Sequence, residues 1–334
     1  MKAIRVAAPG GLDRLSIDEI DTPRDPAPGE IRVQLKASSL NFHDYGVVSG
    51  AMKTEDGRIP MSDGAGVVEA VGDGVEFAPG DHVVSTFFPQ WFDGPARIGD
   101  FSTTPGDGVD GYAREMVTAP ATAFTRAPEG WSHEEAATIT TAGLTAWRAL
   151  IVDGGLKAGD DVLILGTGGV SIWALQIARA MGARVFATSS SDDKRAKLEE
   201  MGAAGTVNYR DDTGWGSTIR EMTGGRGVDH VVEVGGPATL DQSIDAARIG
   251  GHLSLIGVLT GRGGEVPTAK LMAKQQRLQG LIVGSRTMQQ DMVRAMERTG
   301  IRPVIDRSFP LTEIPDAFAH EESGKHFGKI CLSI

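Results

Sequence analysis

Cysteine is nearly absent from this sequence, since Cys331 is the only one among 334 residues. A single thiol excludes an intrachain disulfide and a cysteine-rich zinc site. The chain also lacks any apolar run near the roughly 18 residues that a membrane span needs. Its first residues interrupt a short apolar stretch with a charge and then a Pro-Gly break, which is unlike a signal peptide. We therefore expect a cytoplasmic protein.

Positive charge is also scarce relative to negative charge. The 33 Lys and Arg residues are outnumbered by 44 Asp and Glu residues, which leaves a formal net charge of −11. An acidic surface repels phosphate backbones and anionic lipids, so we expect neither nucleic acid nor membrane as a partner, but a small-molecule substrate. The length predicts two domains, and the 45 glycines indicate many tight turns.

The first 125 residues have the pattern of an antiparallel, barrel-like β domain. Short alternating runs are separated by Gly/Pro turns, as at Ile31–Leu35, Gly66–Val71 and Asp81–Ser85. The stretch Phe87–Asp110 fits no period and is rich in aromatic residues. A loop of this length with aromatic side chains is expected to pack on something.

The sequence pattern changes from short strands to helices near Trp131. Ser132 and Glu135 have capping-box spacing, and a helical run through Ala149 follows them. Strands and helices then alternate, which is the signature of a doubly wound parallel sheet in an α/β protein. The predicted strands are Asp161–Leu165, Arg184–Thr188, Thr206–Asn208, Asp229–Val232, His252–Ile256 and Leu278–Val283. After Pro303 we expect another β-run, a short helix and a last strand, Lys329–Ser333, which return to the first domain.

A glycine-rich turn follows the first of these strands. Gly166 allows the tight turn, and Gly168 removes a side chain where backbone N–H groups would approach a pyrophosphate. After Gly169 we expect a helix from Val170 to Met181, and the small Ser171 stands where the third glycine of the dinucleotide fingerprint would be. The alternative is a glycine-rich turn that binds no ligand.

The end of the second strand decides between NADPH and NADH. NAD enzymes place an acidic residue here for the ribose hydroxyls, whereas this chain has Thr188-Ser189-Ser190-Ser191 followed by Lys194 and Arg195. Hydroxyls and cations suit a 2′-phosphate, so NADPH is favoured over NADH. Asp192 and Asp193 could still serve a ribose. Alternatively, Ser191 only caps the next helix and these two carboxylates complement its dipole.

These residues belong to a wider set of motifs along the whole chain. They include Asn41-Phe42-His43-Asp44, Ser62–Val68, Thr141–Trp147, the Gly166–Val170 turn, Asn208-Tyr209-Arg210, Gly224–Asp229 and His326–Lys329. The set resembles the medium-chain dehydrogenase/reductase superfamily, in its zinc-independent, quinone-oxidoreductase-like or alcohol dehydrogenase-like branch. The resemblance implies a GroES-like β-barrel catalytic domain (1–125, completed by 302–334), a Rossmann domain (126–301) and a homodimer or tetramer.

The sequence differs from the zinc-dependent members of the superfamily at the positions of their zinc ligands. Asn41 stands where those enzymes have Cys, and Met61-Ser62-Asp63 stands where they have Gly-His-Glu. Of these residues only Asp63 could bind zinc, and a catalytic site needs three protein ligands. The region of their structural zinc lobe is Phe87–Asp110, which contains no Cys. We therefore expect no zinc, and a loop that either covers an apolar substrate or packs on the barrel as a remnant.

By family position, Asn41, His43 and Tyr45 are expected to face the nicotinamide. The Asn41 amide could stabilise an oxyanion and His43 could protonate an enolate, while Asp63 is expected to order the cleft. The alternatives are an Asn in a turn, a His bonded to the cofactor and a Tyr that only packs. The resemblance also implies cofactor contacts at Ser189, Ser190 and Lys194, and at Thr141, Tyr209, Gly257, Val258, Val283 and Ser285.

Three functions remain open from the sequence. The first is NADPH-dependent delivery of hydride to an activated alkene (an enone or enal) or to a quinone. The second is a zinc-free alcohol dehydrogenase or carbonyl reductase. The third is an NADPH-binding protein without turnover.

Overall fold

The structure is a computed structural model that describes residues 1–334. The chain divides into two compact units. One consists of Met1–Leu144 together with Val283–Ile334, and the other consists of Thr145–Ile282. No helix combines the length and the apolar character that crossing a bilayer requires.

The first unit is built on β-sheets. A two-stranded antiparallel sheet pairs β1 (Lys2–Val6) with β2 (Leu15–Glu19). The larger sheet has seven strands in the order β14-β15-β3-β4-β5-β7, with β6 also paired to β3. These strands are β3 (Glu30–Ser39), β4 (Ala65–Val71), β5 (His82–Ser85), β6 (Met116–Pro120), β7 (Phe124–Arg126), β14 (Ile305–Pro310) and β15 (Lys329–Ser333).

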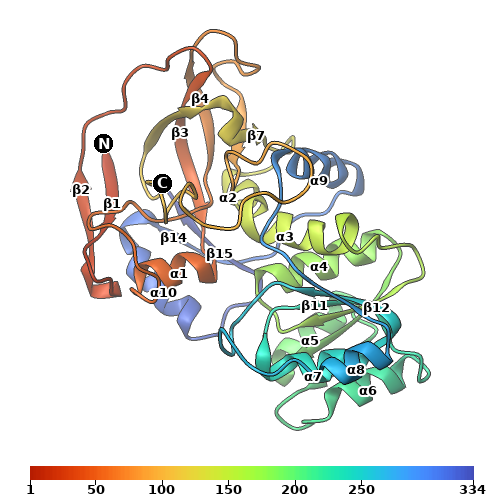
Figure 1. Ribbon diagram of the computed structural model, residues 1–334. Helices are drawn as coiled ribbons and strands as arrows, with labels where there is room; N and C mark the ends of the chain where they lie inside the picture. Colours follow the sequence, from red (N-terminus) through yellow and green to blue (C-terminus); the bar gives the residue numbers. More distant parts are fainter. The chain divides into compact units, whose positions relative to one another are not determined.

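Alternation of buried and more exposed residues along β3 explains how this sheet forms a core. Ile31, Val33 and Leu35 are buried on one face, where they join Val68, Val83 and Phe124. The C-terminal strand β15 pairs antiparallel with β3, so segments far apart in the sequence, such as those of Cys331 and Ser39, lie side by side in one sheet (Figure 1). The helices of this unit are α1 (Phe42–Val48), α2 (His133–Ala137), α9 (Arg286–Thr299) and α10 (Ile314–Glu322), with short 3₁₀ turns at Leu12–Arg14, Ala121–Ala123 and Leu311–Glu313.

The second unit contains a six-stranded parallel sheet in the order β10-β9-β8-β11-β12-β13. All five residues of β8 are buried, as expected for a central strand covered on both faces. The strands are β8 (Asp161–Leu165), β9 (Arg184–Ser189), β10 (Gly205–Asn208), β11 (Val228–Glu233), β12 (Ala247–Leu255) and β13 (Arg277–Gly280). The order reverses between β8 and β11, so the predicted doubly wound α/β sheet is confirmed.

Helices alternate with these strands and supply the core of the second unit. Trp215, Ile219, Leu240 and Ile244 on the helices pack with strand residues such as Phe186. The helices are α4 (Gly169–Ala180), α5 (Asp192–Glu200), α6 (Trp215–Met222), α7 (Pro237–Ala246) and α8 (Thr268–Ala273).

The boundaries of the two compact units differ from the domain boundaries that the sequence predicts. The expected boundaries were 125/126 and 301/302, whereas the units change over after Leu144 and Ile282. The reason is packing, since α2 lies against β3, β4 and β5, and α9 lies against β7. Both helices therefore belong to the first unit.

The predicted helical run from Ser132 is interrupted in the structure. The capping box of Ser132 and Glu135 is confirmed and begins α2. A π-helical turn, η3 (Ile139–Gly143), then precedes α3 (Leu144–Trp147), and a second π turn, η4 (Arg148–Val152), follows it. β-Branched residues and Gly in η3 weaken the preference for a regular α-helix, and π turns are frequent at functional sites.

The last predicted strand of the parallel sheet is shorter than expected. It ends at Gly280, and Val283, which was expected in the strand, has a positive φ of 46° that a strand does not allow. Met61, two residues before Asp63, also has a positive φ of 78°. Strained backbone of this kind in residues with a side chain often accompanies functional sites.

Candidate active site

The glycine-rich turn of the second unit has the geometry of a dinucleotide site. Gly166 has a φ of +71°, which favours glycine, and Gly168 is the N-cap of α4. A Cβ added at either glycine would meet no atom within 4 Å, so open space lies beside the turn. Gly169 and Val170 open the helix, where backbone N–H groups have no partner within the helix. This cradle fits a pyrophosphate.

Ser171 explains how the turn holds its shape. Its buried hydroxyl donates a hydrogen bond of 2.7 Å to the carbonyl of Leu165, at the end of β8. The residue that replaces the third glycine therefore ties the helix to the strand, in addition to being small.

The structure brings several of the predicted ribose-end residues together. Ser189 ends β9, and its carbonyl accepts a hydrogen bond of 3.1 Å from the backbone N–H of Tyr209, whose residue is 42% exposed. Ser191 is the N-cap of α5, and its hydroxyl accepts from the backbone N–H of Lys194. The capping interpretation of Ser191 is thus confirmed. Ser190 and the Lys194 side chain are the other residues here that the sequence suggested for the 2′-phosphate of NADPH.

Asp192 is one of the two acidic residues, with Asp193, that could serve the ribose of NADH. Its carboxylate accepts hydrogen bonds from the Arg195 guanidinium at 2.9 Å and from the Asn208 amide at 3.2 Å. Two donors therefore counter the negative charge at the start of α5.

Glu233 was not found from the sequence and organises another loop of this unit. Its fully buried carboxylate accepts from the backbone N–H groups of Gly235 and Gly236, from the Thr239 hydroxyl at 2.6 Å and from the Ser243 hydroxyl. It is the last residue of β11, at the carboxyl edge where ligands of such sheets bind. A Glu at the end of a buried strand before Gly-Gly was the available signal.

The remaining predicted cofactor residues lie in different units. Gly257 and Val258 follow β12, and a Cβ at Gly257 would lie 2.0 Å from the Val234 carbonyl, so this position needs glycine. Val283 and Ser285 belong to the first unit. The buried Ser285 hydroxyl accepts from the backbone N–H of Met288 and caps α9.

Asp63 is the centre of a buried polar network in the first unit. The carboxylate is fully buried and accepts hydrogen bonds from the Ser39 hydroxyl, from the Asn41 amide at 2.9 Å and from the Thr141 hydroxyl at 2.6 Å. The Lys329 ammonium lies 3.7 Å away. Burial raises the pKa of the Asp63 carboxyl, and Lys329 opposes that rise.

Asn41 directs both ends of its amide into this network. Its Nδ2 donates to Asp63 and, at 3.1 Å, to Asp44, while its Oδ1 accepts a hydrogen bond of 2.7 Å from Lys329. An amide has only two N–H donors. The oxyanion role expected for Asn41 would require these bonds to be exchanged. In the observed arrangement Asn41 instead orients the start of α1.

His43 lies one residue into α1 and is surrounded by aromatic rings. The centroid of its ring is 4.5 Å from that of Phe101 and 5.6 Å from that of Phe87. Its Nε2 lies 3.4 Å from the Asp107 carboxylate, yet this enclosed atom has no aligned hydrogen-bond partner. Asp107, which sequence reasoning missed, is the charged neighbour of His43. The aromatic loop packs around His43.

Tyr45 has a different environment. Its hydroxyl donates a hydrogen bond of 2.7 Å to Glu322, which raises the pKa of the phenol. Its ring packs beside Phe318 in the apolar cluster of α10 and β15. This geometry corresponds to the packing alternative for Tyr45.

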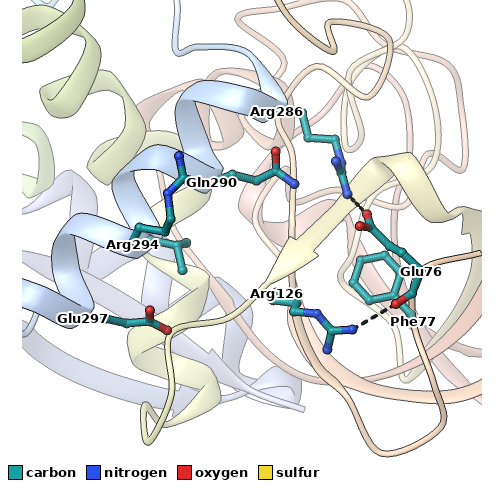
Figure 2. Close-up of a pocket in the computed structure, with 8 residues that line it drawn as sticks. Glu76, Phe77, Arg126, Arg286, Gln290, Arg294 and Glu297 are labelled. Carbon is teal, nitrogen blue, oxygen red and sulfur yellow. Dashed lines mark hydrogen bonds and ion pairs between the residues drawn. The ribbon is translucent and has the colours of Figure 1, made fainter.

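A cavity of about 290 Å³ lies elsewhere in the first unit, between β7 and α9 (Figure 2). Arg126 and Arg286 line it, and Glu76 accepts hydrogen bonds from both, through its carbonyl and its carboxylate. None of the site residues predicted from the sequence lines this cavity.

Comparisons with known proteins identify the family. Residues 27–129 match the alcohol dehydrogenase GroES-like domain, and residues 169–298 match the zinc-binding dehydrogenase model. A zinc-type alcohol dehydrogenase-like protein of Schizosaccharomyces pombe is 40% identical over 97% of this chain and 96% of its own length. The chain belongs to the medium-chain dehydrogenase/reductase superfamily.

Solved structures of this superfamily share the whole fold. An NAD-dependent alcohol dehydrogenase superposes with a TM-score of 0.90 at 33% identity, covering 100% of both chains. A crotonyl-CoA carboxylase/reductase in complex with NADP superposes with a TM-score of 0.86 at 26% identity, covering 100% of this chain and 95% of the other. The predicted superfamily, the GroES-like and Rossmann architecture and the oxidoreductase class are therefore confirmed.

The zinc implied by these family names does not fit the residues present. No three His, Cys, Asp or Glu side chains are grouped so that they could hold a metal ion. Asp63 and Asn41 are instead joined to each other and to the Lys329 ammonium. A cation already lies against the one carboxylate that could have been a ligand, and a catalytic zinc needs three.

Replacing Gly168 with Ala tests the cofactor cradle. The backbone φ of −76° accepts Ala, but the new methyl group would project into the space beside the turn. We expect the Kd for NADPH in a fluorescence titration to rise about tenfold or more. The Tm without cofactor should change by no more than about 2 °C.

Gly280→Ala is the matched control, since a Cβ at Gly280 also meets no atom within 4 Å. It should leave the Kd unchanged. Equal Kd values for Gly168→Ala and the unmodified protein would contradict the pyrophosphate assignment.

Proposed function

We propose that this protein is a zinc-independent, NADPH-dependent reductase that delivers hydride to the β-carbon of an enone or enal, or to a quinone. The observation that carries the proposal is the Asn41–Asp63–Lys329 network, which occupies the position where related dehydrogenases would hold a metal. Without a Lewis acid, an acceptor that forms a delocalised enolate or phenolate is easier to reduce than an isolated carbonyl.

Bound NADPH supplies the hydride, and the chain must supply a proton. We assign that role to His43, because its Nε2 is an enclosed polar atom without an aligned hydrogen-bond partner. The Asp107 carboxylate lies 3.4 Å from this atom without an aligned hydrogen bond, and Phe87 and Phe101 pack against the imidazole. Asn41 and Asp63 act as positioning residues.

The choice of NADPH rests on the ribose end of the site. Ser189, Ser190 and Tyr209 provide polar groups around the end of β9, and Lys194 lies on the first turn of α5. The Asp192 carboxylate is countered by Arg195 and Asn208. The similar carboxylase/reductase was solved with NADP, which supports the same choice.

A second candidate is a zinc-free alcohol dehydrogenase or carbonyl reductase. The names of the S. pombe relative and of the NAD-dependent alcohol dehydrogenase favour it. The two functions differ in the carbon that receives the hydride.

Replacing Lys194 with Ala tests the NADPH assignment. Loss of one charge-assisted hydrogen bond, worth roughly 1.5–3 kcal/mol, should raise KM for NADPH about tenfold or more. KM for NADH should change little. Lys197→Ala, one turn along the exposed side of α5, is the control and should affect neither cofactor. Equal losses for NADPH and NADH in Lys194→Ala would rule out the 2′-phosphate contact.

Reduction of 2-cyclohexenone with NADPH deuterated at the transferable position tests the reaction class. We expect cyclohexanone that carries deuterium on the β-carbon. An allylic alcohol labelled at the carbinol carbon would instead establish carbonyl reduction. A parallel assay with a quinone and a saturated aldehyde separates an unsuitable acceptor from a protein that binds NADPH without turnover.

His43→Gln tests the proton donor in the same assay. We expect kcat to fall about 100-fold or more, with the Kd for NADPH unchanged. His320→Asn is a matched control, because His320 also pairs with a carboxylate, that of Asp306 at 2.7 Å. An unchanged kcat in His43→Gln would exclude His43 as the proton donor.

A further inference from the structure

Four ionisable side chains are enclosed together behind helix α1. Lys329 is 3% exposed, and Asp63 and Asp44 are at most 1% exposed. Glu321 is partly exposed as a residue, but its Oε2 is enclosed and has no hydrogen-bond partner. The three carboxyl groups come from different segments, α1, the loop before β4 and α10, and that of Asp63 lies 3.7 Å from the ammonium.

The Lys329 ammonium is held inside this cluster. It donates hydrogen bonds to the Leu40 carbonyl and to Asn41 Oδ1 at 2.7 Å, and it lies 3.7 Å from Asp63 Oδ2. Two of its three N–H donors are thus used, and Lys329 is too deeply buried for a substrate to reach the ammonium. Lys329 can therefore influence the reaction only through the groups that it holds.

The other members of the cluster are accommodated in different ways. Asp44 accepts from the backbone N–H of Asn41, the Asn41 amide, and the backbone N–H and hydroxyl of Ser62, which suits a carboxylate. Glu321 lacks such donors at Oε2, and burial raises its pKa to about 8. The Glu321 carboxyl is therefore largely protonated at neutral pH, and Asp63 is the carboxyl whose contact with the Lys329 ammonium, at 3.7 Å, defines the centre of the cluster.

We infer that Lys329 is a positioning residue of the reaction, whose ammonium takes the place of a metal as the fixed cation of the catalytic unit. The inference deepens the proposed function and rests on it. Lys329 fixes which way the Asn41 amide points, and Asn41 caps the helix that carries His43. Through Asp63 it also fixes the Thr141 hydroxyl on the π turn η3. No charged group on the substrate is needed for this role.

Lys329→Met tests the inference, because Met keeps much of the volume and removes the charge. We expect kcat to fall about 100-fold, as for a displacement of catalytic groups by about 1 Å. The Kd for NADPH should stay within about twofold, since the glycine-rich turn and the ribose-end residues belong to the other unit. Lys274→Met is the matched control. Lys274 donates to the carbonyls of Ile244 and Asp245, and its loss should lower Tm without lowering kcat.

The double variant Asp63→Asn/Lys329→Met separates positioning from folding, and it also serves if Lys329→Met does not fold. It removes both members of the 3.7 Å contact together, so neither is left buried without the other and the Tm should recover, while kcat should remain low because the amide orientations are no longer fixed. Recovery of kcat together with Tm would show a merely structural role and overturn the inference. So would a Lys329→Met enzyme with unchanged kcat.

The experiments distinguish a wrong role for Lys329 from a wrong reaction class. All variants are assayed with the acceptor that the unmodified enzyme reduces, so a result of carbonyl reduction leaves the Lys329 test intact. If the unmodified protein reduces no acceptor, the crystal structure of Lys329→Met decides. A reoriented Asn41 amide supports the inference, and an unmoved Asn41 overturns it.

Discussion

The buried contact of the Lys329 ammonium with Asn41 and Asp63 is the constraint on which the polar network of the first unit depends. Removing charges from water is costly, and the pairing repays this cost only where hydrogen bonds satisfy the remaining atoms. Here Ser39, Thr141 and Asn41 satisfy Asp63, while the Leu40 carbonyl and Asn41 satisfy Lys329. Because β15 brings Lys329 from the far end of the sequence, the C-terminal strand completes the site that the N-terminal segment begins.

In the second unit the candidate cofactor site is shaped by backbone geometry rather than by a buried ion pair. Gly166, Gly168 and Ser171 shape a turn at the helix N-terminus, and Glu233 holds the loop after β11 by accepting from its backbone N–H groups. Such a site accepts the dinucleotide by shape and helix-end N–H groups. The glycine-rich turn and the His43 environment are thus built by different residues in different units, which is why variants can separate them.

Much of the fold could be predicted from the sequence, because its strands are short apolar runs between glycine turns. The strands Asp161–Leu165 and Lys329–Ser333 have the predicted bounds. The π turns around α3 and the end of β13 could not be predicted, because tertiary packing decides them. Family position indicated Asn41 and Asp63, but Lys329 and Asp107 are distant in sequence, and only the fold brings them to Asn41 and His43.

The measurement that tests the central claim most directly is the zinc content of the purified enzyme, determined together with its turnover after exhaustive EDTA treatment. The Lys329-centred site predicts full activity at a zinc content far below one ion per chain, and no gain when zinc is added back. Activity that disappears with EDTA and returns in proportion to added zinc would contradict the account.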